Sequence, residues 1–199
     1  MAPVVETNLT PKVIVLGDSM KIRILVPDEG KLDINWDKIQ EVSPDGDIIH
    51  TVNNLSSATL LSTTDITSPF LDDTLDIGVG KTIVLQPPNT TASIVITVFV
   101  FNTPGEFVVH DETASYVAGD VKFGVSIVDW PVGDENNKII FGAKLVTNSP
   151  LEGNQGDRKV KIGKALLSSL AVATGPDNTK LAVETSLSDG SIQWTFPAK

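Results

Sequence analysis

Apolar and polar residues alternate along most of the chain in short runs, which is the period of β-strands. Runs rich in Val, Ile, Thr and Phe recur about every 8–15 residues and are separated by clusters of Gly, Pro, Asp and Asn. In 92–101 both alternating faces are apolar, which predicts a central strand that is covered on both sides. The pattern therefore predicts an all-β protein of about 12–14 strands, folded as an antiparallel β-sandwich or jelly roll.

At most one short helix is expected. The leucines of 165–173 also fit a helical stripe, so this segment is predicted as either a helix or a strand. No other segment between strands has a helical period, which argues against parallel β-α-β units. Asp189 and Gly190 between two apolar runs predict a tight hairpin near the C-terminus.

The length of 199 residues fits one β-sandwich domain covering 1–199. The alternative is two small β domains, 1–103 and 104–199. The single domain is favoured because a strand at 92–101 with two apolar faces needs neighbours on both sides.

Composition removes several classes of chemistry. The chain has no cysteine, which excludes disulfides, a thiol nucleophile and a cysteine-ligated metal. Its net charge of −10 argues against nucleic acid or an anionic membrane as a partner. No apolar run is long enough to span a bilayer, and no signal peptide is visible at the start. We therefore expect a soluble protein, either cytoplasmic or exported and already processed.

The charge is also uneven along the chain. Residues 1–157 contain 22 acidic and 9 basic residues, whereas 158–199 contain 3 acidic and 6 basic ones. An acidic body with a basic end could support head-to-tail contact between copies. The alternative is chance variation over a short C-terminal segment.

Catalytic residue types are scarce. Only His50 and His110 could act as the base of a serine triad, and the Gly-x-Ser-x-Gly pattern is absent. Both histidines end apolar runs, so they are interpreted as residues at strand tips. His110 and Glu112 share one strand face, but two ligands do not make a metal site. We therefore expect no enzymatic activity, no cofactor and no designed transition-metal site.

Calcium is a weak alternative. Asp72, Asp73 and Asp76 supply several oxygens within one loop, but their spacing does not fit an EF-hand loop. The polar loop that contains Asp134 and Asn136 does not fit it either.

A glycine pair near the middle of the chain resembles the end of a phosphate-binding loop. Gly78, Gly80, Lys81 and Thr82 fit that motif, but its leading glycine should stand where the chain has Leu75. A strand-like run follows instead of a helix. The glycines are interpreted as a flexible turn at the entry to a strand.

The best candidates for contact with a ligand or partner lie on the surface. Trp130 and Pro131 end a predicted strand and either close the end of the sandwich or form a stacking platform. Trp36 is a second aromatic candidate, and Asp134 and Asn136 could hold sugar hydroxyls beside Trp130.

These features favour a structural or adhesive β-sandwich that acts through surface contacts with proteins, including copies of itself in an array or filament. Edge strands are suited to such docking unless charges block them, as Lys12, Lys21, Lys159 and Lys161 are predicted to do. A lectin-like carbohydrate-binding module, with a glycan as partner, is the first alternative. A glycan hydrolase with paired carboxylates is the second, because spacing alone does not reveal such a pair.

Overall fold

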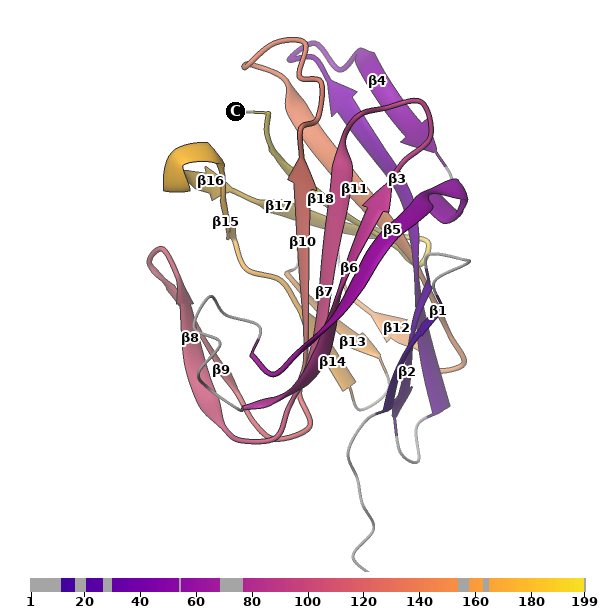
Figure 1. Ribbon diagram of the computed structural model, residues 1–199, viewed down its shortest axis with the longest axis vertical. Coiled ribbons are helices and arrows are strands. Elements are labelled where there is room, and N and C mark those ends of the chain that lie inside the picture. The colour runs from indigo at the N-terminus through magenta and orange to yellow at the C-terminus, as the bar shows by residue number, and fades with distance from the viewer. Residues whose placement is uncertain are drawn as a thin grey trace, which may run out of the picture.

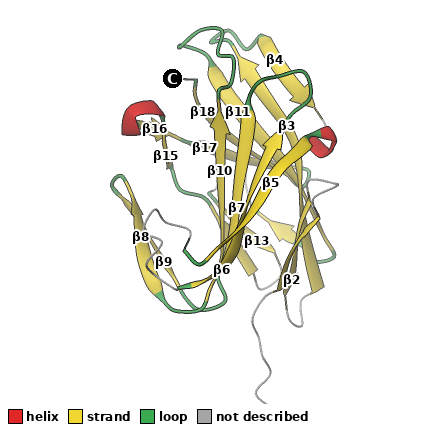
Figure 2. Ribbon diagram, in the orientation of Figure 1, coloured by secondary structure: helices red, strands yellow, loops and turns green. Residues whose placement is uncertain are grey.

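The computed structural model describes residues 12–16, 21–26, 30–53, 55–68, 77–153, 158–162 and 165–198. These residues form an all-β structure in which every strand pairing is antiparallel (Figures 1 and 2), so the predicted fold class is confirmed. They contain 18 strands, more than the 12–14 expected, because strands of two to four residues are too short to show a period. Their only helices are the single turns η1 (Leu55–Ser57) and η2 (Pro176–Asn178), and neither could cross a membrane.

One layer of the sandwich is a seven-stranded sheet of order β1-β2-β3-β11-β18-β17, with β4 also paired to β3. Its strands are β1 (Lys12–Leu16), β2 (Lys21–Val26), β3 (Gly30–Val42), β4 (Ile48–Asn53), β11 (Lys138–Thr147), β17 (Glu184–Ser188) and β18 (Ser191–Pro197). The β17–β18 hairpin turns at Asp189 and Gly190, both with positive φ, as the Asp-Gly pair predicted.

The other layer is a four-stranded sheet of order β10-β7-β6-β5. Its strands are β5 (Thr59–Ile66), β6 (Gly78–Gln86), β7 (Ser93–Phe101) and β10 (Val121–Val128). The strand with two apolar faces, β7, lies between β10 and β6, as its pattern predicted.

Three small sheets complete the structure. They are formed by β8 (Gly105–Val109) with β9 (Glu112–Tyr116), by β12 (Leu151–Glu152), β13 (Lys159–Ile162) and β14 (Ala165–Ser168), and by β15 (Val172–Thr174) with β16 (Lys180–Ala182). The helical alternative for 165–173 is wrong, because this segment contains β14 and the start of β15.

The lysines predicted to block sheet edges are placed differently. Lys12 lies on β1, at the end of its sheet. Lys21 lies on β2, between β1 and β3, while Lys159 and Lys161 lie on β13, between β12 and β14. The prediction is therefore wrong for Lys21, Lys159 and Lys161, since none of them is on an edge strand.

A single hydrophobic cluster lies between the two large sheets. It draws residues from both sides of position 103, the boundary of the two-domain alternative, including Ile22, Ile39, Ile94 and Ile192. Trp36 belongs to this cluster at 4% exposed, with its ring centroid 5.1 Å from that of Phe141. The ring of Trp36 therefore leaves no face for a sugar.

The glycine pair lies inside β6, not in a turn before it, so the interpretation as a flexible turn is wrong. Gly80 pairs with Phe99 of β7, and a Cβ atom at Gly80 would lie 2.4 Å from the carbonyl oxygen of Val98 and 2.6 Å from the Phe99 ring. A Cβ atom at Gly78 would lie 2.1 Å from the carbonyl oxygen of Val100. The absence of side chains at Gly78 and Gly80 lets the Phe99 ring of β7 pack directly against the backbone of β6.

Candidate functional site

Three loops meet at one end of the sandwich (Figure 1). Residues 43–47 join β3 to β4, residues 87–92 join β6 to β7, and residues 129–137 join β10 to β11. We call this end, together with Ile48 and Ile49 at the start of β4, the tip. The tip brings together Trp130, Pro131, Asp134 and Asn136, four of the five surface candidates from the sequence.

The longest loop of the tip is anchored on a buried carboxylate. Glu41 is fully buried on the inward face of β3. Its Oε1 accepts a hydrogen bond from the Gly133 N–H (2.7 Å) and another from Asn137 Nδ2 (2.6 Å). Its Oε2 accepts no hydrogen bond, and His50 Nε2 lies 4.0 Å from it. This arrangement ties the 129–137 loop to β3.

Two opposing effects act on the pKa of Glu41. Burial raises the pKa, but the hydrogen bonds from Asn137 and from the backbone N–H of Gly133 favour the ionised form, and the net pKa lies below its ordinary value. Glu41 is therefore ionised at neutral pH. A carboxylate that binds two loop donors in a buried site fixes the loop more firmly than a neutral acceptor.

The loop also stabilises itself. Asp134 Oδ1 accepts hydrogen bonds from both the backbone N–H and the Nδ2 of Asn136, each at 2.8 Å, which lowers the pKa of Asp134. The Ala198 N–H donates to the carbonyl oxygen of Asn137 at 2.9 Å. The side chains of Asp134 and Asn136 are therefore exposed but engaged with each other, which gives this loop a defined shape.

The tip exposes large apolar side chains. Ile48, Ile49 and Val132 are 58%, 45% and 42% exposed. Ile49 lines an open recess of about 560 Å³ together with Pro44 and residues of the 129–137 loop. Large exposed aliphatic side chains within one end of a domain are typical of surfaces that bind another macromolecule.

The loops of the tip also carry exposed carboxylates. The 43–47 and 129–137 loops contain five acidic residues and no lysine or arginine. All five are exposed: Asp45, Asp47, Asp129, Asp134 and Glu135. Protein interfaces usually combine apolar and charged side chains.

Trp130 and Pro131 line a second, smaller recess at the tip, of about 220 Å³. The Trp130 side chain is half-buried and packs against the core, and its indole N–H is buried without a hydrogen-bond acceptor. Pro131 is exposed. Polar groups complete the walls of this recess: His50, Thr51, Asn53, Asn89 and Thr90.

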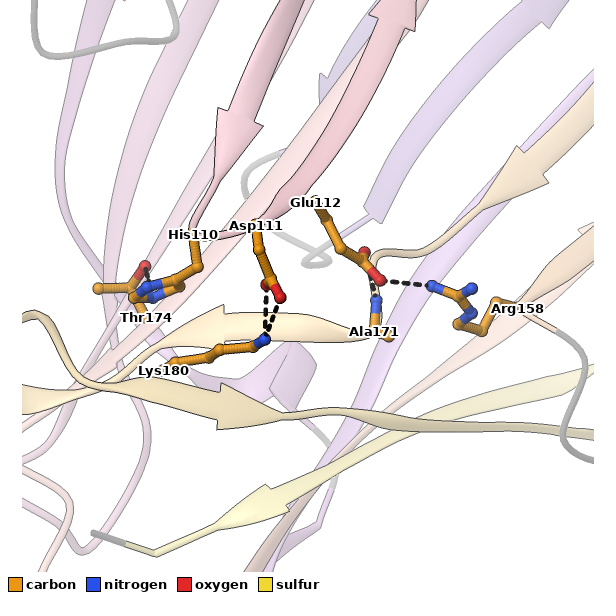
Figure 3. Close-up of polar contacts among 7 residues, drawn as sticks. All are labelled: His110, Asp111, Glu112, Arg158, Ala171, Thr174 and Lys180. Carbon is orange, nitrogen blue, oxygen red and sulfur yellow. Dashed lines mark hydrogen bonds and ion pairs between the residues drawn. The ribbon is translucent and has the colours of Figure 1, made fainter.

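The second histidine lies in a different contact, at the turn of the β8–β9 hairpin (Figure 3). His110 Nε2 lies 3.3 Å from Thr174 Oγ1, and Asp111 forms an ion pair with Lys180. Glu112 binds both Arg158 (2.9 Å) and the backbone N–H of Ala171 (2.8 Å). These residues hold the hairpin against β15 and β16.

The remaining metal candidates are the three aspartates proposed as calcium ligands. Asp72, Asp73 and Asp76 lie outside the described residues. Within the described ranges, no group of three or more His, Cys, Asp or Glu side chains is arranged to hold a metal ion.

No known protein family, curated protein or solved structure matches this chain.

Glu41 is the residue of the site that sequence reasoning missed. A signal was present, because Glu41 follows Ile39 at a strand spacing of two, which places a charge on an apolar face. Between Trp36 and Lys38, opposite Gly142 and Ala143 of β11, β3 contains a bulge that shifts the alternation of inward and outward side chains. The inward position of Trp36 therefore does not predict on which face of β3 Glu41 lies.

Proposed function

We propose that this protein is a non-enzymatic structural subunit that associates with copies of itself through the tip. The observation that carries the proposal is the exposure of Ile48, Ile49 and Val132 on a surface whose longest loop is fixed by Glu41. A preorganised loop loses little conformational entropy on binding, so more of the apolar contact contributes to affinity.

Replacing both Ile48 and Ile49 with aspartate is expected to weaken self-association at least about tenfold, because two large apolar side chains leave the contact. Sedimentation velocity over a wide concentration range measures this. The matched control is Val108→Asp with Leu166→Asp on β8 and β14, which changes two exposed aliphatic side chains away from the tip (Figure 1) and should leave association unchanged. A wild-type protein that stays monomeric at millimolar concentration contradicts the proposal.

A carbohydrate-binding function is the second candidate, and the recess beside Trp130 favours it. The recess combines one aromatic ring with amide and hydroxyl groups of Asn53, Asn89 and Thr51, which is the chemistry that sugar sites use.

Binding of a glycan in this recess is expected to be lost on Asn53→Ala, because an exposed amide that holds a hydroxyl is removed without disturbing the core. A glycan array with wild type and the variant side by side is the measurement. Thr91→Ala, an exposed change in the neighbouring loop, serves as the control. Equal binding by wild type and Asn53→Ala would remove this candidate.

The hydrolase alternative has less support. A glycosidase needs one carboxylic acid with a raised pKa as its proton donor. The described carboxyl groups with a resolved shift, Asp33, Glu41, Asp111 and Asp134, all have a lowered pKa. We therefore do not propose hydrolysis.

A further inference from the structure

A strongly basic surface lies on an acidic protein. Six cationic side chains lie on the outer face of the seven-stranded sheet along β1, β2, β3 and the end of β11: Lys12, Lys21, Arg23, Lys31, Lys38 and Lys144. Among the described residues, two carboxylates, Asp33 and Asp37, lie beside them. Lys138 and Glu184, farther along the same face, form an ion pair with each other at 3.8 Å. The formal charges of the six cations and these two aspartates sum to +4, whereas the whole chain carries −10, so the remaining residues carry −14. We call this surface the basic face.

The strand register places these side chains together. Arg23 pairs with Asp33 across β2 and β3, and Lys144 of β11 pairs with Asn35 of β3. The residues that alternate with them, such as Ile22 and Ile34, belong to the core. The charged set therefore points away from the core and extends across four adjacent strands, β1, β2, β3 and β11.

The charge of the basic face is not neutralised from within. Asp33, almost fully buried, binds Arg23 through both oxygens at 2.6 and 2.8 Å, while Lys21 and Lys31 lie 4.0 and 3.9 Å away. The hydrogen bonds from Arg23 hold the pKa of Asp33 below its ordinary value. One carboxylate thus faces three cations, which leaves positive charge available to an external anion.

The basic face and the tip are complementary in two respects. The two acidic loops of the tip carry five carboxylates against the +4 of the basic face. Each surface also exposes aliphatic side chains, Leu25 and Val146 on the basic face and Ile48 and Ile49 at the tip. Opposite charge around apolar contact is the arrangement that specifies a protein–protein interface.

The tip cannot reach the basic face of its own molecule. β3 carries residues of both surfaces, with Lys31 about 35 Å and Lys38 about 13 Å from Val42 at the usual rise per residue, and an extended strand does not fold back on itself. Figure 1 shows β1 and β2 at the opposite end of the sandwich from the β3–β4 turn. A contact between these two surfaces therefore joins two molecules.

We propose that the basic face of one copy receives the tip of a second copy. This inference rests on the proposed function, and it names the surface that the tip binds. Because the two surfaces differ, the contact is head-to-tail, and repeating it gives an open filament or a ring. A membrane or a nucleic acid is a poorer occupant, since the −14 on the other surfaces repels an extended polyanion.

The test uses two variants of the full chain that each lose one surface. The face variant carries Lys12→Glu, Lys31→Glu and Lys144→Glu, and the tip variant carries Ile48→Asp and Ile49→Asp. Each is expected to be monomeric alone, with at least about tenfold weaker association than wild type. In an equimolar mixture, the intact tip of the face variant can bind the intact basic face of the tip variant. The mixture should therefore form a 1:1 complex and nothing larger, because neither partner has a second intact surface to extend it.

Light scattering after size exclusion measures these masses, and circular dichroism confirms that each variant is folded. If the triple variant fails to fold, Lys144→Glu alone replaces it. A face variant that assembles like wild type, while the tip variant does not, overturns this inference and leaves the proposed function intact. Failure of the mixture to form a complex, with binding of phosphatidylserine vesicles or single-stranded DNA lost in the face variant, also overturns it. A monomeric wild type overturns the proposed function itself.

Discussion

Glu41→Ala is expected to destabilise the protein by about 3 kcal/mol, because one buried and one part-buried hydrogen bond to a charged acceptor are lost and the buried Asn137 amide is left without this acceptor. The donors are the Gly133 N–H and Asn137 Nδ2, both of which bind Glu41 Oε1. The 129–137 loop should lose its attachment to β3 at the same time. Urea denaturation measures the stability, and hydrogen exchange at the Gly133 amide measures the release of the loop.

Glu41→Gln is the matched control, because it keeps an acceptor at Oε1 and removes only the charge. We expect a smaller loss of stability and a Gly133 amide that stays protected. If Glu41→Ala leaves the protection of this amide unchanged, the carboxylate does not anchor the loop.

Glu41 also predicts part of the acid sensitivity of the fold. Its pKa in the folded protein lies below its ordinary value of about 4.3. The unfolded chain therefore takes up a proton at higher pH than the folded protein does. The stability that Glu41 contributes is present above the unfolded pKa and is lost as the pH falls through the lower folded pKa. As the pH falls below the unfolded pKa, Glu41→Gln should show a shallower fall in the free energy of unfolding than the wild type, which urea denaturation at a series of pH values measures.

Gly80→Ala is expected to cost about 2–4 kcal/mol, because the new Cβ atom would lie 2.4 Å from the carbonyl oxygen of Val98, so that β6 or β7 must shift. Gly78→Ala should act in the same direction for the same reason, since its Cβ would lie 2.1 Å from the carbonyl oxygen of Val100. Urea denaturation of each variant is the measurement.

Gly124→Ala in β10 provides the comparison for these substitutions. A Cβ at Gly124 would meet only Thr97 Cβ at 3.6 Å, an ordinary contact, so this change should alter stability by less than about 1 kcal/mol. Equal effects of Gly80→Ala and Gly124→Ala would show that the approach of β7 to β6 does not constrain Gly80.

The role of Gly78 and Gly80 could not be predicted from the sequence. The missing leading glycine at Leu75 argued against a phosphate loop. The reason for the glycines, however, is the ring of Phe99 on the neighbouring strand. Cross-strand register is a property of two segments together, so neither segment alone reveals it.

The candidate site was predicted only in part. Trp130, Pro131, Asp134 and Asn136 were identified from the polar loop that follows an apolar strand, and they do lie together at the tip. The buried Glu41 that holds this loop was missed, because its partner Gly133 lies 92 residues away in the sequence. A hydrogen bond between such distant residues leaves no local pattern.

The sequence by itself determined the class of the fold, the central strand β7 and the Asp-Gly hairpin, because each depends on local alternation or on turn chemistry. Only the tertiary structure decided where charge gathers. Along the chain the basic excess lies in 158–199, but in space five of the six cations of the basic face come from 12–38. Strand pairing brings these lysines and Arg23 onto one face beside Lys144, and charge acts through distance in space and not through order along the chain.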